Sequence, residues 1–266
     1  MTLRCIQQPH PHLHAELAHG VLTLAIQRPE SKNALYGELY LWIAQALDEA
    51  DQSQEVRVVI LRGATADFTA GNDMQDFMKF VQSPLQGKAG DAPPFVLLKA
   101  AARFSKPLIA AVRGVAIGIG VTILLHTDLA YSDESALFQL PFVSLGLSPE
   151  GASSKLLVQR AGYHQAAELL FTAEKFNSTK AMQIGLINSI ESDVYAYAQM
   201  QAQKLASLPL ASLKQTKALM KHDLAEILTC IDHEAEIFMQ RVSSPEMREA
   251  VQAFMQKRKP DFSQFN

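Results

Sequence analysis

The sequence has few of the features that mark disulfide-bonded, metal-binding or secreted proteins. Its 266 residues include two cysteines, Cys5 and Cys230, which are too far apart in sequence to form a metal-ligand motif or a disulfide framework. The N-terminus has no basic stretch followed by an apolar one, and the C-terminus is not a peroxisomal address. We therefore expect no secretory signal and a cytoplasmic protein.

Long apolar runs and blocks of one charge are also scarce. The longest apolar run, residues 108–125, is interrupted by Arg113 and three glycines, which argues against a membrane span. The formal net charge is -3, and the short basic run at residues 257–259 is typical of a solvated helix end. We expect no nucleic-acid partner and no membrane partner.

The composition and the residue patterns predict a globular α/β protein. Hydrophobic residues make up 48% of the chain and charged residues 19%, which is ordinary for one large domain, alone or with an appendage. Residues 20–27 alternate as a strand does, and residues 37–51 have a helical period. Residues 83–94, rich in Gly and Pro, are predicted to form a mobile loop. Further strands are predicted at 56–62, 107–113, 128–132 and 136–138, and further helices at 95–104, 118–125, 155–161 and 166–170.

From about Val194 the pattern is almost entirely helical, with breaks at Pro209 and Pro245. Strands therefore alternate with helices in the first part of the chain, and a helical region follows. This order predicts helices that cover the faces of a sheet.

Two glycine-rich turns each follow a predicted buried strand and lead into a helix. They are residues 68–74 (FTAGNDM) and 114–120 (GVAIGIG). A glycine before a helix allows a tight turn and leaves the first N–H groups unpaired, which suits an anion or a developing oxyanion. The alternative is that these glycines only permit close strand–helix packing. The spacing of the second turn excludes the GxGxxG dinucleotide fingerprint.

Eight segments of the chain form a series that can be compared with known families. They are residues 28–35, 68–73, 106–112, 114–120, 128–129, 136–138, 145–149 and 185–188. In this order they together resemble the crotonase (enoyl-CoA hydratase/isomerase) superfamily. The resemblance implies a spiral of ββα units over residues 1–193 and a helical trimerisation region over residues 194–266. It also implies a homotrimer or a hexamer (dimer of trimers), a coenzyme A thioester as substrate, and neither a tightly bound cofactor nor a metal.

The resemblance also assigns binding roles to the two turns. The backbone N–H groups of Asn72 and Ile119, each directly after a glycine of its turn, would form an oxyanion hole. The coenzyme A part of the substrate would lie along two short segments. Its predicted binding residues are Lys32, Ala34, Leu35, Ala70, Asp73 and Met74.

The positions at which hydratases of this family carry glutamates hold Thr122 and Phe142 in this chain. Adding water to an enoyl thioester is easiest to explain with two carboxylates, so hydration of the usual design is not expected. Moving a double bond from the β,γ to the α,β position requires less. One carboxylate can remove the α-proton and return it at the γ-carbon.

Glu150 is the remaining candidate for that carboxylate. Its surroundings, residues 141–154, resemble the peroxisomal-type Δ3,Δ2-enoyl-CoA isomerases, whose base is this glutamate. The local pattern alone fits another interpretation, in which Ser148 caps a helix, Pro149 is its first residue and Glu150 is an acid favoured by the helix dipole. We expect Glu150 to be catalytic, in an apolar pocket near Phe142 that raises its pKa. Another crotonase-type reaction, including slow hydration, and a non-catalytic acyl-CoA-binding module remain alternatives.

Other polar residues carry weaker signals. The histidines of residues 10–19 suggest a metal, but no acid cluster accompanies them, so we expect a solvated segment before the first strand. His126 and Asp128 resemble a dyad, but we expect structural roles for both. Trp42 is expected in the core, and residues 153–154 have no nearby base that would make a serine nucleophilic.

Overall fold

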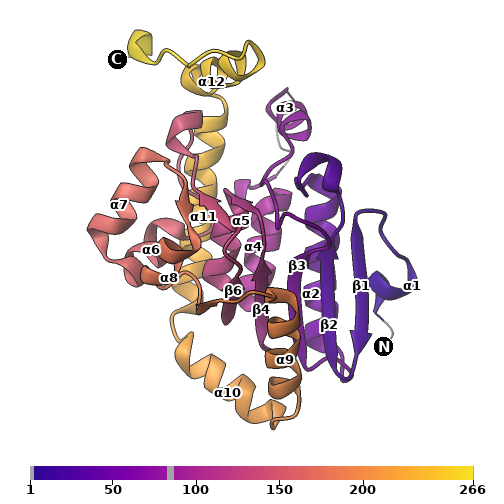
Figure 1. Ribbon diagram of the computed structural model, residues 1–266. Coiled ribbons are helices and arrows are strands. Elements are labelled where there is room, and N and C mark those ends of the chain that lie inside the picture. The colour runs from indigo at the N-terminus through magenta and orange to yellow at the C-terminus, as the bar shows by residue number, and fades with distance from the viewer. Residues whose placement is uncertain (1–2, 83–86, 266) are drawn as a thin grey trace.

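The centre of the molecule is a twisted sheet with the strand order β1-β2-β3-β4-β6-β9 (Figure 1). The computed structural model describes residues 3–82 and 87–265. β1 and β2 are antiparallel, and the other neighbouring strands of this sheet are parallel. The strands are β1 (Leu13–Ala18), β2 (Val21–Ile26), β3 (Val58–Gly63), β4 (Leu108–Val112), β6 (Leu129–Ser132) and β9 (Ser189–Ile190).

A second, small sheet has the order β5-β7-β8. β5 (Val115–Ile117) pairs in parallel with β7 (Leu137–Gln139), which pairs antiparallel with β8 (Phe176–Asn177). β5 directly follows β4 along the chain, so the two sheets adjoin where the second glycine-rich turn begins.

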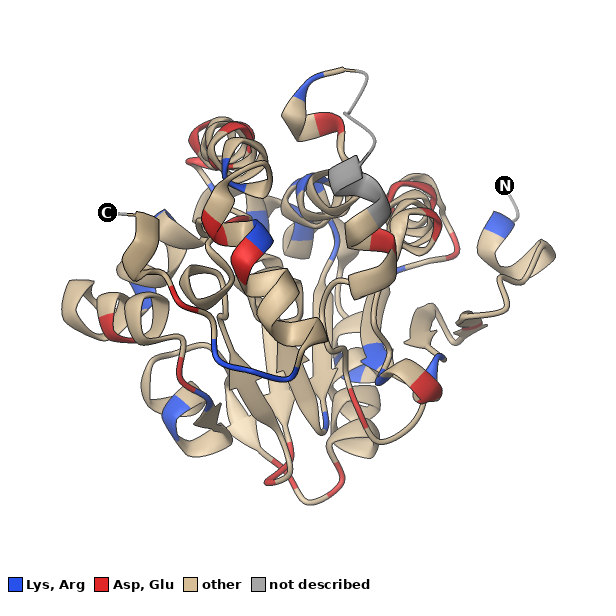
Figure 2. Cartoon of the chain, turned by 90° about the horizontal axis from the view of Figure 1, so that it is seen from above, with Lys and Arg blue, Asp and Glu red and all other residues tan. Residues whose placement is uncertain are grey.

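Helices cover both faces of the large sheet. α2 (Gly37–Gln52) and α4 (Pro93–Arg103) pack on one face, whereas α9 (Val194–Ala206) packs on the other. The parallel strands are therefore buried on both sides, which explains why β3 and β4 are almost continuously apolar. Charged residues lie mainly on the surrounding helices and loops (Figure 2).

The remaining helices lie around the two sheets (Figure 1). α11 packs against α4, where the Lys99 ammonium lies 2.9 Å from an Asp232 carboxylate oxygen. Within residues 3–82 and 87–265, no helix has both the length and the apolar character needed to cross a membrane. These helices are α1 (Arg4–Gln7), α3 (Met74–Gln82), α5 (Ile119–Thr122), α6 (Ser153–Ala161), α7 (Tyr163–Thr172), α8 (Ser178–Gln183), α10 (Leu210–Met220), α11 (Leu224–Val242) and α12 (Pro245–Met255).

The N-terminal segment differs from its prediction. It contains β1, which the sequence analysis missed, and His10 is buried with its ring 3.3 Å from the Tyr36 hydroxyl. The expectation of a solvated segment is therefore wrong for His10, although His14 and His19 are exposed. Trp42 is half-buried beneath the guanidinium of Arg4 rather than in the core.

The loop predicted over residues 83–94 is shorter than expected. Residues 83–86 lie outside the described part of the chain. Ala89–Asp91 form a 3₁₀ turn, and α4 already begins at Pro93. A proline fits this position because the first residue of a helix needs no N–H partner within it.

Candidate active site

The two glycine-rich turns lie side by side. The Thr69 N–H donates to the Val115 carbonyl at 3.0 Å, and the Ile117 N–H donates to the Thr69 carbonyl at 3.1 Å. Gly71 has a φ of +85°, and a Cβ at this position would lie 2.6 Å from the Ile117 carbonyl oxygen. Only glycine allows the two backbones to approach this closely.

Each turn presents a backbone N–H group at the position predicted from the sequence. Among residues 3–82 and 87–265, neither the Asn72 N–H nor the Ile119 N–H has a hydrogen-bond acceptor. The neighbours of Asn72 are engaged, because Leu35 donates to the Gly71 carbonyl and Asp73 donates to the Leu35 carbonyl. Ile119 is the first residue of α5, where N–H groups have no partner within the helix. The adjoining turns thus offer two donors to an incoming oxygen.

The six residues predicted to bind coenzyme A come together as two adjacent segments. Residues 32–35 and 70–74 are joined by the bond from the Ala70 N–H to the Lys32 carbonyl, at 2.9 Å, and by the bond from the Asp73 N–H to the Leu35 carbonyl, at 2.7 Å. Lys32 is exposed, whereas Leu35 is buried at the edge of a pocket.

Asp73 has a structural task that the sequence did not indicate. One of its carboxylate oxygens lies 2.6 Å from Arg28 Nη1, and the other accepts the N–H groups of Gln75 and Asp76 at the start of α3. Partial burial opposes ionisation, but these hydrogen bonds and the Arg28 charge outweigh it and lower the pKa of Asp73. Asp73 is therefore an ionised cap that fixes the first turn.

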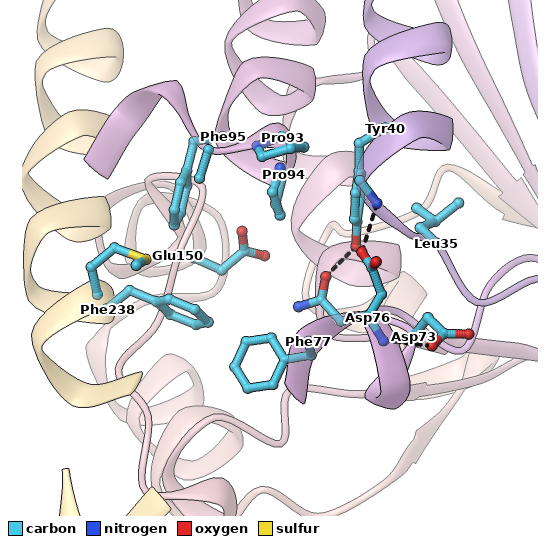
Figure 3. A pocket seen from close by; sticks show the side chains of 14 residues that line it. Leu35, Tyr40, Asp73, Asp76, Phe77, Pro93, Pro94, Phe95, Glu150 and Phe238 are labelled. Carbon is cyan, nitrogen blue, oxygen red and sulfur yellow. Dashed lines mark hydrogen bonds between the residues drawn. The ribbon is translucent and has the colours of Figure 1, made fainter. Parts of the chain in front are cut away.

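A pocket lies beside these turns, enclosed by α2, α3, α4 and α11 (Figure 3). Phe77 of α3 and Phe95 of α4 supply part of its wall. Phe238 of α11 completes it, with its ring 5.8 Å from that of Phe95 and 6.5 Å from that of Phe77. The apolar lining residues are Leu35, Phe77, Ala92, Pro93, Pro94, Phe95, Phe238 and Met239, and the polar ones are Tyr40, Asn72, Asp73, Asp76 and Glu150.

Glu150 extends into this pocket, with its carboxylate directed into the space that Phe77, Pro94 and Tyr40 border (Figure 3). Only 4% of the residue is exposed. Its Oε1 accepts a hydrogen bond of 2.7 Å from the Thr122 hydroxyl, and its Oε2 has no hydrogen-bond partner within the described residues. One oxygen is thus anchored and the other is available to a bound molecule.

The surroundings of Glu150 favour its neutral form. Burial, the largest cause, raises the pKa of the carboxyl to about 8. The hydrogen bond from Thr122 opposes this rise, and the negative charge of Glu234 adds to it. The pKa of Tyr40, which shares the pocket, lies well above its ordinary value because its hydroxyl is buried and near Glu150. Tyr40 is therefore a neutral neighbour of a carboxyl that titrates near physiological pH.

The interpretation of Glu150 as an acid in the first turn of a helix is wrong. α6 begins at Ser153, after a left-handed Ala152, so Glu150 precedes the helix. Ser148 is no N-cap, since its buried hydroxyl has no hydrogen-bond partner in the described part of the chain. The acid at the start of α6 is Glu234 of α11, whose Oε1 accepts the Ser154 N–H at 3.0 Å.

Two further contacts of the site were not predicted. Tyr40 of α2 donates a hydrogen bond to the Asn72 side-chain oxygen, which connects the first turn to α2 (Figure 3). Thr122 was noted only as a missing acid, yet its hydroxyl contacts Glu150. In sequence, Tyr40 is indistinguishable from a core aromatic of an amphipathic helix. Phe142, expected near Glu150, is buried but is not among the residues that line the pocket.

His126 and Asp128 are structural, as expected. Asp128 accepts hydrogen bonds from the Leu108 N–H and from the Lys217 ammonium, at 2.8 Å and 2.6 Å. His126 lies 2.8 Å from the Gly151 carbonyl oxygen through Nε2, and burial lowers the pKa of its imidazole to about 3. We assign the tautomer with a proton on Nε2, because a carbonyl oxygen can only accept.

The close approach of the two turns gives a stability prediction. Gly71→Ala should lower the free energy of unfolding by on the order of 3–4 kcal/mol, because it adds backbone strain to an overlap with the Ile117 carbonyl. Gly185→Ala is the matched control, since Gly185 also has a positive φ but has nothing within 4 Å of an added Cβ. It should cost only about 1–2 kcal/mol. Equal losses in urea titrations of the two variants would contradict the proposed turn–turn contact.

Comparison with known proteins agrees with this architecture. A family model described as enoyl-CoA hydratase/isomerase matches residues 16–265. The chain is similar in structure to an enoyl-CoA hydratase/isomerase from Acinetobacter baumannii, with 75% identity, a TM-score of 0.90, and coverage of 92% of this chain and 99% of that one. It is 30% identical to the 2,3-dehydroadipyl-CoA hydratase of Escherichia coli (strain K12), over 91% of this chain and 94% of that protein. It is 31% identical to the enoyl-CoA delta isomerase 2 of Rattus norvegicus, over 91% of this chain and 62% of that protein. The chain therefore belongs to the enoyl-CoA hydratase/isomerase family of the crotonase superfamily.

Proposed function

We propose that this protein is a Δ3,Δ2-enoyl-CoA isomerase in which Glu150 is the single acid–base group. One observation carries the proposal. Of the carboxylates that line the pocket, Asp73 is paired with Arg28, and Asp76 accepts the Gly37 N–H. Within the described part of the chain, Glu150 has neither a cation nor a backbone donor, and its pKa of about 8 lets it both accept and donate a proton near neutral pH.

In the proposed reaction, the thioester oxygen of a 3-enoyl-CoA accepts hydrogen bonds from the N–H groups of Asn72 and Ile119. Ionised Glu150 removes a proton from the α-carbon, and the electron pair moves into a dienolate whose negative charge lies on that oxygen. Glu150 then returns the proton at the γ-carbon, which leaves the double bond conjugated with the thioester. Each oxyanion donor typically contributes about 3 kcal/mol to such a transition state.

The proposed substrate brings coenzyme A with it, so no separate cofactor is required. We place its nucleotide-bearing part along residues 32–35 and 70–74 and its acyl part in the pocket, whose aromatic walls suit a hydrocarbon chain. Those walls also exclude water, which strengthens the hydrogen bonds to a developing oxyanion.

A second candidate is hydration of an enoyl-CoA, which the name of the E. coli relative favours. Glu150 would then activate a water molecule for attack at the β-carbon. The position of a second hydratase acid holds Thr122, whose hydroxyl donates to Glu150 rather than supplying a second carboxylate. The products separate the two reactions, because hydration gives a 3-hydroxyacyl-CoA and isomerisation gives a 2-enoyl-CoA.

Glu150→Gln tests the proposed function. The amide keeps the size of the side chain but cannot take up a proton, so isomerisation of a 3-enoyl-CoA should fall by about 10²–10⁴-fold. Calorimetric titration with a saturated acyl-CoA should give an unchanged Kd. Glu226→Gln, at an exposed carboxylate paired with Lys155, is the control and should be fully active. Turnover near that of the wild type in Glu150→Gln would reduce Glu150 to a structural residue.

The pH dependence is a second test. A general base acts only when ionised, so kcat/KM should rise with pH through about 8 and then level off. A rate that stays constant across this pH range, or that falls as the pH rises, would mean that Glu150 is not the base.

We also propose that the protein assembles as a homotrimer or a dimer of trimers. Large apolar side chains are exposed on the later helices, among them Phe171, Leu219 and Phe254, which are 69%, 79% and 64% exposed. Covering them with a second copy of the chain would remove apolar surface from water, which is favourable. Light scattering of the purified protein should give three or six chains per particle, and a monomer at micromolar concentration would contradict the proposal.

A further inference from the structure

We propose that Thr122 is a positioning residue, whose hydroxyl holds the Glu150 carboxylate in the orientation that faces the pocket. The proposal rests on the function proposed above, because it assigns Thr122 a role only through Glu150. It assigns a role to Thr122, a position that is notable in the sequence only because it lacks a carboxylate.

The hydroxyl of Thr122 is committed to Glu150. Thr122 is fully buried at the end of α5, and its Oγ1 donates to Glu150 Oε1 at 2.7 Å. A threonine within a helix commonly bonds to a carbonyl of the preceding turn instead, but here the described residues show no such bond. Because a β-branched side chain has few allowed rotamers in a helix, the hydroxyl is a fixed anchor.

A second bond from the same segment fixes the backbone beside Glu150. α5 continues as a 3₁₀ turn, Ile123–His126, and His126 Nε2 lies 2.8 Å from the Gly151 carbonyl oxygen. Thr122 directly precedes this turn, and His126 is its last residue. They therefore hold two consecutive residues of the loop, one through its side chain and one through its backbone.

Close packing leaves this loop little freedom. Gly151 has a φ of +73°, and a Cβ there would lie 3.3 Å from Thr122 Cβ and 3.2 Å from the methyl groups of Leu98. The loop therefore rests directly on α5 and α4. The carboxylate cannot turn away from Thr122 through a shift of the backbone without disturbing this contact.

The same segment also carries one of the proposed oxyanion donors. α5 begins at Ile119, three residues before Thr122. One helical turn therefore connects the N–H group that would stabilise the dienolate oxygen with the hydroxyl that anchors the base. A single rigid element then sets the distance between the place where charge develops and the group that moves the proton.

The other groups around Glu150 do not stabilise its ionised form. Glu234 of α11 is an acid, Tyr40 of α2 is neutral, and buried His126 is neutral as well. On α3, Asp73 is held by Arg28, and Asp76 accepts the Gly37 N–H of α2. The bond from Thr122 is thus the one interaction of the described residues that favours the carboxylate.

Thr122→Val and Thr122→Ser, in the full-length protein, test the proposal. Valine keeps the shape but removes the donor, so the rising limb of the kcat/KM profile should move to higher pH by about one unit. The kcat at the high-pH plateau should fall about tenfold or more, because the carboxylate loses its orientation, while KM changes little. Thr122→Ser keeps the hydroxyl donor, so the rising limb of its kcat/KM profile should stay at the same pH as in the wild type. Thr122→Ala gives a second variant without the hydroxyl if valine lowers the yield of folded protein.

Several outcomes would overturn the proposal. Thr122→Val could show the wild-type limb and plateau, or the serine variant could shift as far as valine does. Glu150→Gln, assayed in parallel, separates this failure from failure of the proposed function. If Glu150→Gln remains active, the function itself is wrong. If it is inactive while Thr122→Val behaves as the wild type, only the positioning role is wrong.

Discussion

Burial of the Glu150 carboxyl is the constraint on which the rest of the site depends. A carboxylate in a largely apolar pocket is unfavourable, and the described residues provide it with only one hydrogen bond, from Thr122. The resulting pKa of about 8 makes the group a stronger base than a solvated glutamate and leaves it able to return the proton. The pKa of Glu150 is higher in the folded protein than in the unfolded chain. Its contribution to the free energy of unfolding therefore falls as the pH rises from the unfolded-state pKa through about 8.

The fold also supplies the two backbone hydrogen-bond donors that would act together with this base. Two turns at the ends of buried strands are pressed together at Gly71, and each leaves a backbone N–H group without a partner in the described residues. Parallel strands covered by helices on both faces hold these turns rigidly. The base and the donors therefore belong to elements whose positions are fixed by core packing, which is the arrangement that electrostatic preorganisation requires.

The sequence was informative where a local pattern determines a local structure. Most strands and helices followed from apolar periodicity, and the glycines correctly indicated two turns leading into helices. Periodicity failed for β1, where buried and exposed residues mix. The capping pattern of Ser148 and Pro149 was also misleading, because α6 begins only at Ser153. Contacts between distant residues were not predictable. Tyr40, Thr122, Glu234 and Phe238 look like ordinary helix residues, and only the fold brings them to the pocket wall or to the surroundings of Glu150.

The central claim is that one buried carboxyl carries one proton from the α-carbon to the γ-carbon. Isomerisation in ordinary water of a 3-enoyl-CoA with deuterium at the α-carbon tests it most directly. Because only 4% of Glu150 is exposed, the deuteron should exchange slowly with solvent, and mass spectrometry should find part of the label at the γ-carbon of the product. A product that carries only solvent hydrogen at the γ-carbon, even in the first turnover, would contradict a single-carboxyl shuttle.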